Sequence, residues 1–169
     1  LGYPPRSLDS FHSLDDLERL IQKRSRQDIR DMNGDPNIAG RDYQLIAVKK
    51  VCEHFNTKHR RALLVMATGT GKTRTAISLV ELLTRNNWIK NVLFLADRTA
   101  LVNQACENFE KLLPSESKEK LIENSNPTLT KRITFSTYHT VMNYVDKEEK
   151  KLSVGRFDLI IIDEAHRSI

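Results

Sequence analysis

The stretch that decides the fold of this chain is Met66-Ala67-Thr68-Gly69-Thr70-Gly71-Lys72-Thr73. The apolar residues 62–65 before it predict a buried strand, and residues 74–80 after it predict a helix. A glycine-containing loop between a strand and a helix is typical of a phosphate-binding loop. The strict pattern has a glycine where Met66 stands, so a plain glycine-rich turn is the alternative.

Each residue of this loop has a task if it binds a nucleotide. Gly69 and Gly71 let the backbone turn sharply, so that its N–H groups face phosphate oxygens at the positive end of the helix dipole. Lys72 supplies positive charge for the β and γ phosphates, and the Thr73 hydroxyl ligates Mg²⁺. With Thr68 and Thr70, these residues form the predicted phosphate-binding set.

A second stretch with chemical character follows the apolar run at residues 159–162. Its β-branched side chains predict a parallel strand that is buried on both faces. Asp163 and Glu164 come directly after it, where open α/β sheets bind ligands. We expect Asp163 to be the magnesium carboxylate and Glu164 to orient and deprotonate the attacking water. An ordinary charged strand end is the alternative.

Hydrophobic periodicity predicts strands that alternate with helices along most of the chain. The expected helices cover residues 13–29, 42–55, 72–85, 99–113 and 138–144, and the expected strands cover residues 62–65, 92–96, 133–136 and 159–162. Residues 114–130 are expected to form a polar loop or a short irregular insertion. The alternation predicts an α/β fold with a doubly wound, mainly parallel sheet and right-handed crossovers. The chain stops soon after Asp163, so we expect the sheet to lack its last strands.

The first 37 residues are predicted to be a helical lead-in from an upstream domain. Leu14, Leu17, Leu20 and Ile21 give the first helix an apolar stripe, and the basic residues 23–26 near its end are interpreted as a solvated helix terminus. Contact of this basic cluster with DNA is the alternative. Turn-forming residues at 33–37 mark the boundary to the nucleotide-binding unit at residues 38–169.

Composition restricts the class of protein without naming a partner. The chain has 27 Lys and Arg residues against 22 Asp and Glu, a net charge of +5 that is compatible with a polyanion but does not require one. No apolar run approaches the ~20 residues of a membrane span. Cys52 and Cys106 lack the spacing of a metal site or disulfide framework, so we expect reduced core thiols in a soluble cytoplasmic protein.

Five segments in this order resemble superfamily 2 helicases, and more narrowly the motor subunit (R subunit) of type I restriction enzymes. They are Arg41-Asp42-Tyr43-Gln44 and the segments 67–73, 94–104, 136–140 and 158–168. Three features favour that subfamily: the methionine before the phosphate loop, the sequence Leu-Ala-Asp-Arg at 95–98, and the sequence Asp-Glu-Ala-His-Arg-Ser at 163–168.

The resemblance implies a RecA-like P-loop NTPase domain, of which residues 38–169 would be the N-terminal half. It implies that Gln44 recognises the adenine edge with Arg41 beside it, although an exposed helix residue is the alternative for Gln44. It also implies contacts to the DNA sugar-phosphate backbone and a residue that couples the nucleotide site to DNA or to a second motor domain. The implied DNA contacts are Arg98, Thr99, Thr137 and Tyr138, and the implied coupling residue is His166. An ion pair with Asp97 is the alternative for Arg98.

If the resemblance holds, the cofactors are ATP and Mg²⁺, and ATP hydrolysis drives translocation along double-stranded DNA for restriction. The implied partners are the modification and specificity subunits of a restriction complex, with no membrane. Nuclease activity and the arginine of a second motor domain would lie outside these residues, so the isolated fragment is expected to be poorly active. The rival interpretations are another superfamily 2 member, such as a type III restriction subunit, a repair helicase or an RNA helicase, and a module that binds nucleotide without hydrolysing it.

Overall fold

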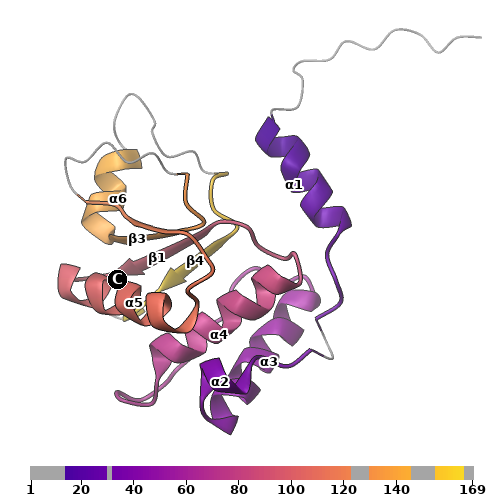
Figure 1. The fold of residues 1–169 in the computed structure, drawn as a ribbon, viewed down its shortest axis with the longest axis horizontal. Coiled ribbons are helices and arrows are strands. Elements are labelled where there is room, and N and C mark those ends of the chain that lie inside the picture. The colour runs from indigo at the N-terminus through magenta and orange to yellow at the C-terminus, as the bar shows by residue number, and fades with distance from the viewer. Residues whose placement is uncertain (1–13, 30–31, 123–129, 146–154, 166–169) are drawn as a thin grey trace, which may run out of the picture.

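The computed structural model describes residues 14–29, 32–122, 130–145 and 155–165. Figure 1 shows the elements of these ranges as a sheet with helices around it. In chain order they are α1 (Leu14–Arg24), α2 (Pro36–Ala39), α3 (Asp42–Asn56), α4 (Lys72–Arg85), β1 (Val92–Ala96), α5 (Thr99–Leu112), β2 (Lys118–Lys120), β3 (Ile133–Thr137), α6 (Tyr138–Val145) and β4 (Leu159–Ile162).

The four described strands form one parallel sheet in the order β2-β3-β1-β4. Val92 at the start of β1 lies opposite Ile133 of β3 on one side and Leu159 of β4 on the other. In Figure 1, α6 lies on one side of this sheet and α5 on the other. Parallel strands joined through helices confirm the predicted α/β class and its mainly parallel sheet.

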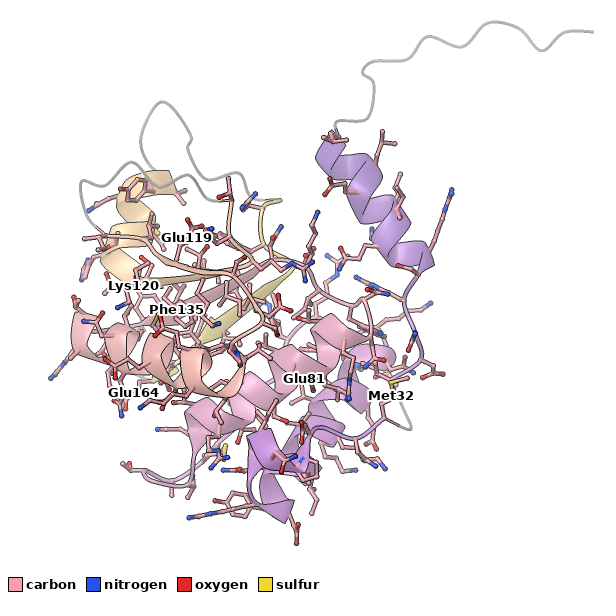
Figure 2. The ribbon with its side chains drawn as sticks, viewed as in Figure 1. Met32, Glu81, Glu119, Lys120, Phe135 and Glu164 are labelled. Carbon is pink, nitrogen blue, oxygen red and sulfur yellow. The ribbon has the colours of Figure 1, made fainter. Side chains whose placement is uncertain are left out.

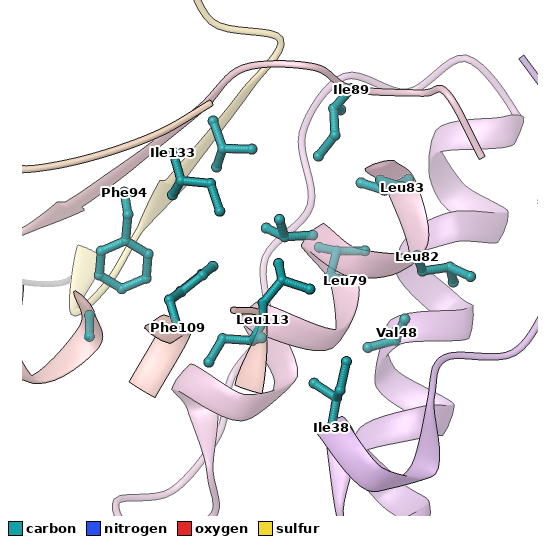
Figure 3. Packing of buried hydrophobic residues seen from close by; sticks show 14 of the residues in the cluster. Ile38, Val48, Leu79, Leu82, Leu83, Ile89, Phe94, Phe109, Leu113 and Ile133 are labelled. Atoms are coloured by element: carbon teal, nitrogen blue, oxygen red, sulfur yellow. The ribbon is translucent and has the colours of Figure 1, made fainter. Parts of the chain in front are cut away.

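The main core lies between the sheet and the helices α3, α4 and α5. Alternate residues of β1 and β3 point into it because successive side chains of a strand face opposite sides of the sheet. Phe94, Phe109 and Phe135 pack there with ring centroids 5.1 to 5.9 Å apart. Figure 3 shows Phe94 and Phe109 next to each other near Ile133, with their rings in an edge-to-face arrangement. Burial of these rings fixes α5 against β1 and β3.

The helices predicted at residues 42–55 and 72–85 are confirmed as α3 and α4, which pack against each other. Val48 and Cys52 of α3 are fully buried, as are Ile77 and Val80 of α4. The two cysteines are free and buried, as expected for core thiols. Burial raises the pKa of Cys52 to about 11 and also raises the pKa of Cys106, because both environments disfavour a thiolate.

The prediction of a strand at residues 62–65 is wrong. Residues 61–67 have no regular secondary structure, and the side chains of Leu63 and Val65 are 79% and 89% exposed. An apolar run becomes a strand only when a neighbouring strand pairs with its backbone. Here the position next to β4 is left unpaired among the described residues.

The prediction that the strand at 159–162 is buried on both faces is also wrong. Alternate side chains of β4 point to opposite faces, and Ile160 and Ile162, on the face away from the main core, are 54% and 48% exposed. Leu159 and Ile161 are half-buried against the main core. The apolar run therefore predicts the strand correctly, whereas packing against only one of its two faces decides its exposure.

The lead-in helix is shorter than predicted. α1 ends at Arg24, and its apolar stripe is exposed, with Leu14 at 72% and Ile21 at 66%. Polar contacts tie this segment to the loop before β1: Glu18 pairs with Lys90, and the Arg26 guanidinium lies 5.1 Å from the centre of the Trp88 ring. Part of the basic cluster predicted to be solvated therefore contacts Trp88.

The polar loop predicted at residues 114–130 contains a strand. β2 pairs in parallel with β3, so Lys118 lies opposite Ile133 although its own sequence is charged. Edge strands tolerate such residues because one side remains open to solvent. The helices predicted at 99–113 and 138–144 are confirmed as α5 and α6. No helix within the described ranges has the length and apolar character that crossing a membrane requires.

Candidate nucleotide and DNA site

Residues from three of the five segments that carry the resemblance meet at the carboxyl edge of the sheet. These segments are 94–104, 136–140 and 158–168. Ala96 at the end of β1 lies opposite Thr137 at the end of β3. On the other side, the Asp163 N–H donates to the Leu95 carbonyl at 2.8 Å and extends the pairing of β4 by one residue. Because neighbouring strands lie about 4.8 Å apart, the backbones of Thr137 and Asp163 are separated by about 10 Å across β1.

The Asp163-Glu164 turn has a constrained backbone. Glu164 adopts φ +54°, a left-handed conformation that is uncommon for residues other than glycine. Its N–H donates to Oδ1 of Asp163 at 3.0 Å, and the Tyr138 hydroxyl donates to the Asp163 carbonyl at 3.4 Å. Figure 2 shows Glu164 on the side of the molecule toward which the arrows of β1 and β4 point in Figure 1. The turn therefore presents its carboxylates at the carboxyl edge.

The phosphate loop has the local geometry that its sequence predicts. Gly69 and Gly71 have φ values of +77° and +85°, and α4 begins at Lys72 directly after them. The Gly71 carbonyl accepts from the Thr75 N–H at 3.0 Å, while the Thr70 hydroxyl donates to the Ala67 carbonyl at 2.6 Å. A left-handed glycine before a helix exposes the first backbone N–H groups of that helix, which is the basis of anion binding.

The direction of α4 places this loop toward the carboxyl edge. A short connection, residues 86–91, joins the end of α4 to the start of β1. α4 has 14 residues and therefore spans about 20 Å, more than the about 17 Å of the five-residue strand β1. In Figure 1 the helix runs opposite to β1, so its beginning lies on the side where β1 and β4 end.

The residues predicted to recognise adenine lie behind the phosphate loop. Gln44 is 2% exposed, so the alternative of an exposed helix residue is wrong. Its Nε2 donates to the Thr70 carbonyl at 2.8 Å. The Arg41 guanidinium is exposed and donates to the Tyr43 hydroxyl at 2.9 Å. The structure therefore places Gln44 and Tyr43 against the loop, with Arg41 against Tyr43, while recognition of adenine by Gln44 and Arg41 stays a prediction.

The residues predicted to contact DNA surround the ends of β1 and β3. The side chain of Arg98 is 69% exposed and forms an ion pair with Asp97 at 3.5 Å. The ion pair that was the alternative to DNA contact for Arg98 is therefore present. Thr99 is exposed at the start of α5. The Thr137 hydroxyl accepts from the Thr140 N–H at 3.3 Å and thereby supports the first turn of α6. Their contact with DNA stays a prediction.

The sequence analysis assigned no role to Tyr43, although Tyr43 lies in the segment 41–44, and did not single out Arg74. Tyr43 donates to the Thr70 carbonyl at 2.7 Å. Arg74 donates to the carbonyls of Asn37 and Ile38, each at 2.8 Å, and so joins α4 to α2. Arg74 belongs to no spacing pattern that separates it from solvent-exposed helix residues. His166 lies outside the described residues.

Comparison with known proteins identifies the family. Residues 37–169, which include every candidate site residue, match the family described as "Type III restriction enzyme, res subunit". The chain belongs to this family.

The chain is similar to endonuclease subunits of type I restriction enzymes. This similarity confirms the resemblance to the type I restriction enzymes. The EcoKI endonuclease subunit of Escherichia coli strain K12 is 30% identical over 96% of this chain. The EcoAI endonuclease subunit of Escherichia coli is 36% identical over 75% of this chain. The alignments cover only 15% and 16% of those relatives.

A solved structure supports the fold of this restriction-enzyme family member. The Sulfolobus solfataricus SWI2/SNF2 ATPase core, solved with double-stranded DNA, superposes with a TM-score of 0.63. It is 21% identical, and the match covers 75% of this chain and 26% of that one. This chain therefore shares the arrangement of helices around a parallel sheet with part of that ATPase core.

Proposed function

We propose that this chain is the ATP-binding part of the motor in a type I restriction enzyme R subunit. In this proposal Mg-ATP hydrolysis drives translocation along double-stranded DNA, in a complex with modification and specificity subunits. One observation supports it: left-handed Gly69 and Gly71 precede the start of α4, and a constrained Asp163-Glu164 turn follows β4 at the carboxyl end of the sheet. This is where parallel α/β sheets bind their ligands.

The proposal gives each site residue one role. The backbone N–H groups of residues 68–73 bind phosphate oxygens, and Lys72 neutralises the charge that develops on the phosphates during in-line attack. Glu164 orients the attacking water and accepts its proton. Arg98 and Thr137 contact the DNA backbone, which suits a motor that moves along any sequence because phosphates carry no sequence information.

The available donors fit a magnesium ion. Thr73 offers a hydroxyl oxygen at the start of α4, and Asp163 offers carboxylate oxygens at the end of β4, and Mg²⁺ prefers such hard oxygen ligands. A Cβ atom added at Gly69 would meet nothing within 4 Å, so the loop is open on that side. The ion would supply charge neutralisation between the β and γ phosphates. Both residues would hold it while Lys72 contacts the phosphates.

A second candidate is the motor of a type III restriction enzyme, because the matching family carries that description. Dependence on partners separates the two candidates: translocation in the type I case requires both modification and specificity subunits. A module that binds nucleotide without hydrolysis is a poorer fit, because it has no use for the Glu164 carboxylate.

The test is ATP hydrolysis and DNA translocation by the full-length protein in its restriction complex. We expect Lys72→Ala and Glu164→Gln each to lower DNA-stimulated phosphate release by at least about 10²-fold. Displacement of a labelled triplex-forming oligonucleotide from double-stranded DNA should fall in parallel.

Matched controls are Lys50→Ala and Glu53→Gln, because these residues form an exposed ion pair on α3 outside the site. Both controls should retain wild-type turnover. Unchanged hydrolysis in both Lys72→Ala and Glu164→Gln would reject the enzymatic proposal. Hydrolysis without oligonucleotide displacement would reject translocation and leave an ATPase.

A further inference from the structure

The Thr70 carbonyl in the phosphate loop receives two side-chain donors from the start of α3. The Tyr43 hydroxyl donates to it at 2.7 Å, and the Gln44 amide nitrogen donates at 2.8 Å. A carbonyl oxygen has two lone pairs, so these two donors satisfy it fully. The loop is thereby attached to a helix that precedes it by more than 25 residues.

This attachment fixes the direction of a backbone donor. In a trans peptide the carbonyl and the following N–H point in opposite directions because the unit is planar. When Tyr43 and Gln44 hold the Thr70 carbonyl toward α3, the Gly71 N–H must point away from α3. The next carbonyl, that of Gly71, accepts from the N–H and hydroxyl of Thr75 at 3.0 and 3.1 Å, which fixes the Lys72 N–H in the same way.

Arg41 strengthens the tyrosine bond. Its guanidinium donates to the Tyr43 hydroxyl at 2.9 Å and lies 5.9 Å from the centre of the Tyr43 ring. A hydroxyl that accepts from a cation becomes a better donor, because hydrogen bonds in a chain polarise one another. Arg41 therefore strengthens the hydrogen bond from Tyr43 to the Thr70 carbonyl without itself contacting the loop carbonyl.

The side chain of Gln44 lies directly against the phosphate loop. Its Oε1 is buried and has no hydrogen-bond partner, and a Cβ atom at Gly71 would lie 2.2 Å from its Nε2. The side chain therefore fills the space directly behind the loop, and the absence of a side chain at Gly71 is what admits it.

We propose that Tyr43, with Gln44, is a positioning residue that orients the phosphate loop for the triphosphate of a nucleotide. The inference rests on the proposed nucleotide-binding function and deepens it. The ligand part that depends on Tyr43 is the triphosphate, whichever base is attached to it. Tyr43 itself contacts the loop, whereas the backbone N–H groups that it directs contact the phosphates.

The test compares a nucleotide with a probe that has no base or sugar. Binding of Mg-ATP and of magnesium tripolyphosphate to the full-length protein is measured by titration calorimetry for wild type and Tyr43→Phe. Loss of one hydrogen bond should weaken both ligands by the same factor, about two- to tenfold. The control is Tyr144→Phe, which removes a tyrosine bond to the Ile122 carbonyl outside the site and should leave both affinities unchanged.

The outcomes separate this inference from the proposed function. Weaker ATP binding with unchanged tripolyphosphate binding would assign Tyr43 to the base or sugar and overturn the inference. Equal affinities in wild type and Tyr43→Phe would overturn it as well. If the wild type binds neither ligand, the proposed function itself fails. A lower melting temperature in Tyr43→Phe with unchanged affinities would show a purely structural tyrosine and likewise overturn the inference.

Discussion

The contact between Gly71 and Gln44 predicts different costs for the same substitution at two neighbouring glycines. Both Gly69 and Gly71 have positive φ values, so an alanine at either position bears left-handed strain of roughly 1–2 kcal/mol. At Gly69 the new Cβ meets nothing within 4 Å, whereas at Gly71 it lies 2.2 Å from Nε2 of Gln44. Gln44 must then withdraw its amide from the Thr70 carbonyl.

The difference between the two variants isolates this collision, because the strain and the change in unfolded-state entropy are common to both. Displacing a buried amide from its acceptor costs about 1–3 kcal/mol. We therefore expect Gly71→Ala to lower the free energy of unfolding by about 1–3 kcal/mol more than Gly69→Ala. Urea unfolding followed by circular dichroism measures both values under one protocol.

A double-mutant cycle tests the cause. In a Gln44→Ala background the obstacle is gone, so Gly71→Ala should cost no more than Gly69→Ala does. Equal costs of Gly69→Ala and Gly71→Ala in the wild-type background would refute the reasoning. A Gly71→Ala cost that persists in the Gln44→Ala background would show that another contact is responsible.

Three further predictions concern the core and the helix contacts. Phe135→Ala should destabilise the fold by about 3–5 kcal/mol in urea unfolding, because its ring is fully buried between two others, while Met142→Ala on an exposed site should change stability by less than about 0.5 kcal/mol. Arg74→Ala should cost about 1 kcal/mol and speed amide hydrogen exchange in α2, and Arg74→Lys should not restore protection because one ammonium lacks the guanidinium fork. Burial raises the pKa of Cys52 from 9.0 to about 11, so the unfolded chain ionises first and stability should fall as pH rises between these values; a Cys52→Ala variant with the same pH slope would contradict this.

Local sequence predicts most elements of this fold. The apolar spacing in α3, α4 and α5 follows the helical repeat, and the runs in β1 and β3 have partners on both sides. These elements bury their apolar residues where the pattern indicates. The failures occur where burial depends on a neighbour: residues 62–65 lack a paired strand, and one face of β4 is exposed.

The candidate site likewise contains residues that local sequence predicts and residues whose roles depend on contacts between separate elements. Gly69, Gly71 and Lys72 are recognisable from sequence because a phosphate loop depends on local backbone conformation. The order of residues at 159–164 likewise indicates a strand that delivers carboxylates. The roles of Tyr43 and Gln44 behind the loop could not be predicted, since their acceptor lies on a different element.

The sequence by itself therefore determined the loop at the start of α4, the acidic turn after β4 and the alternation of helices and strands between them, because each depends on neighbours along the chain. Only the tertiary structure decided which apolar runs are covered and that Tyr43 reaches the Thr70 carbonyl. Burial and side-chain hydrogen bonds depend on distances between separate elements, and packing alone sets those distances.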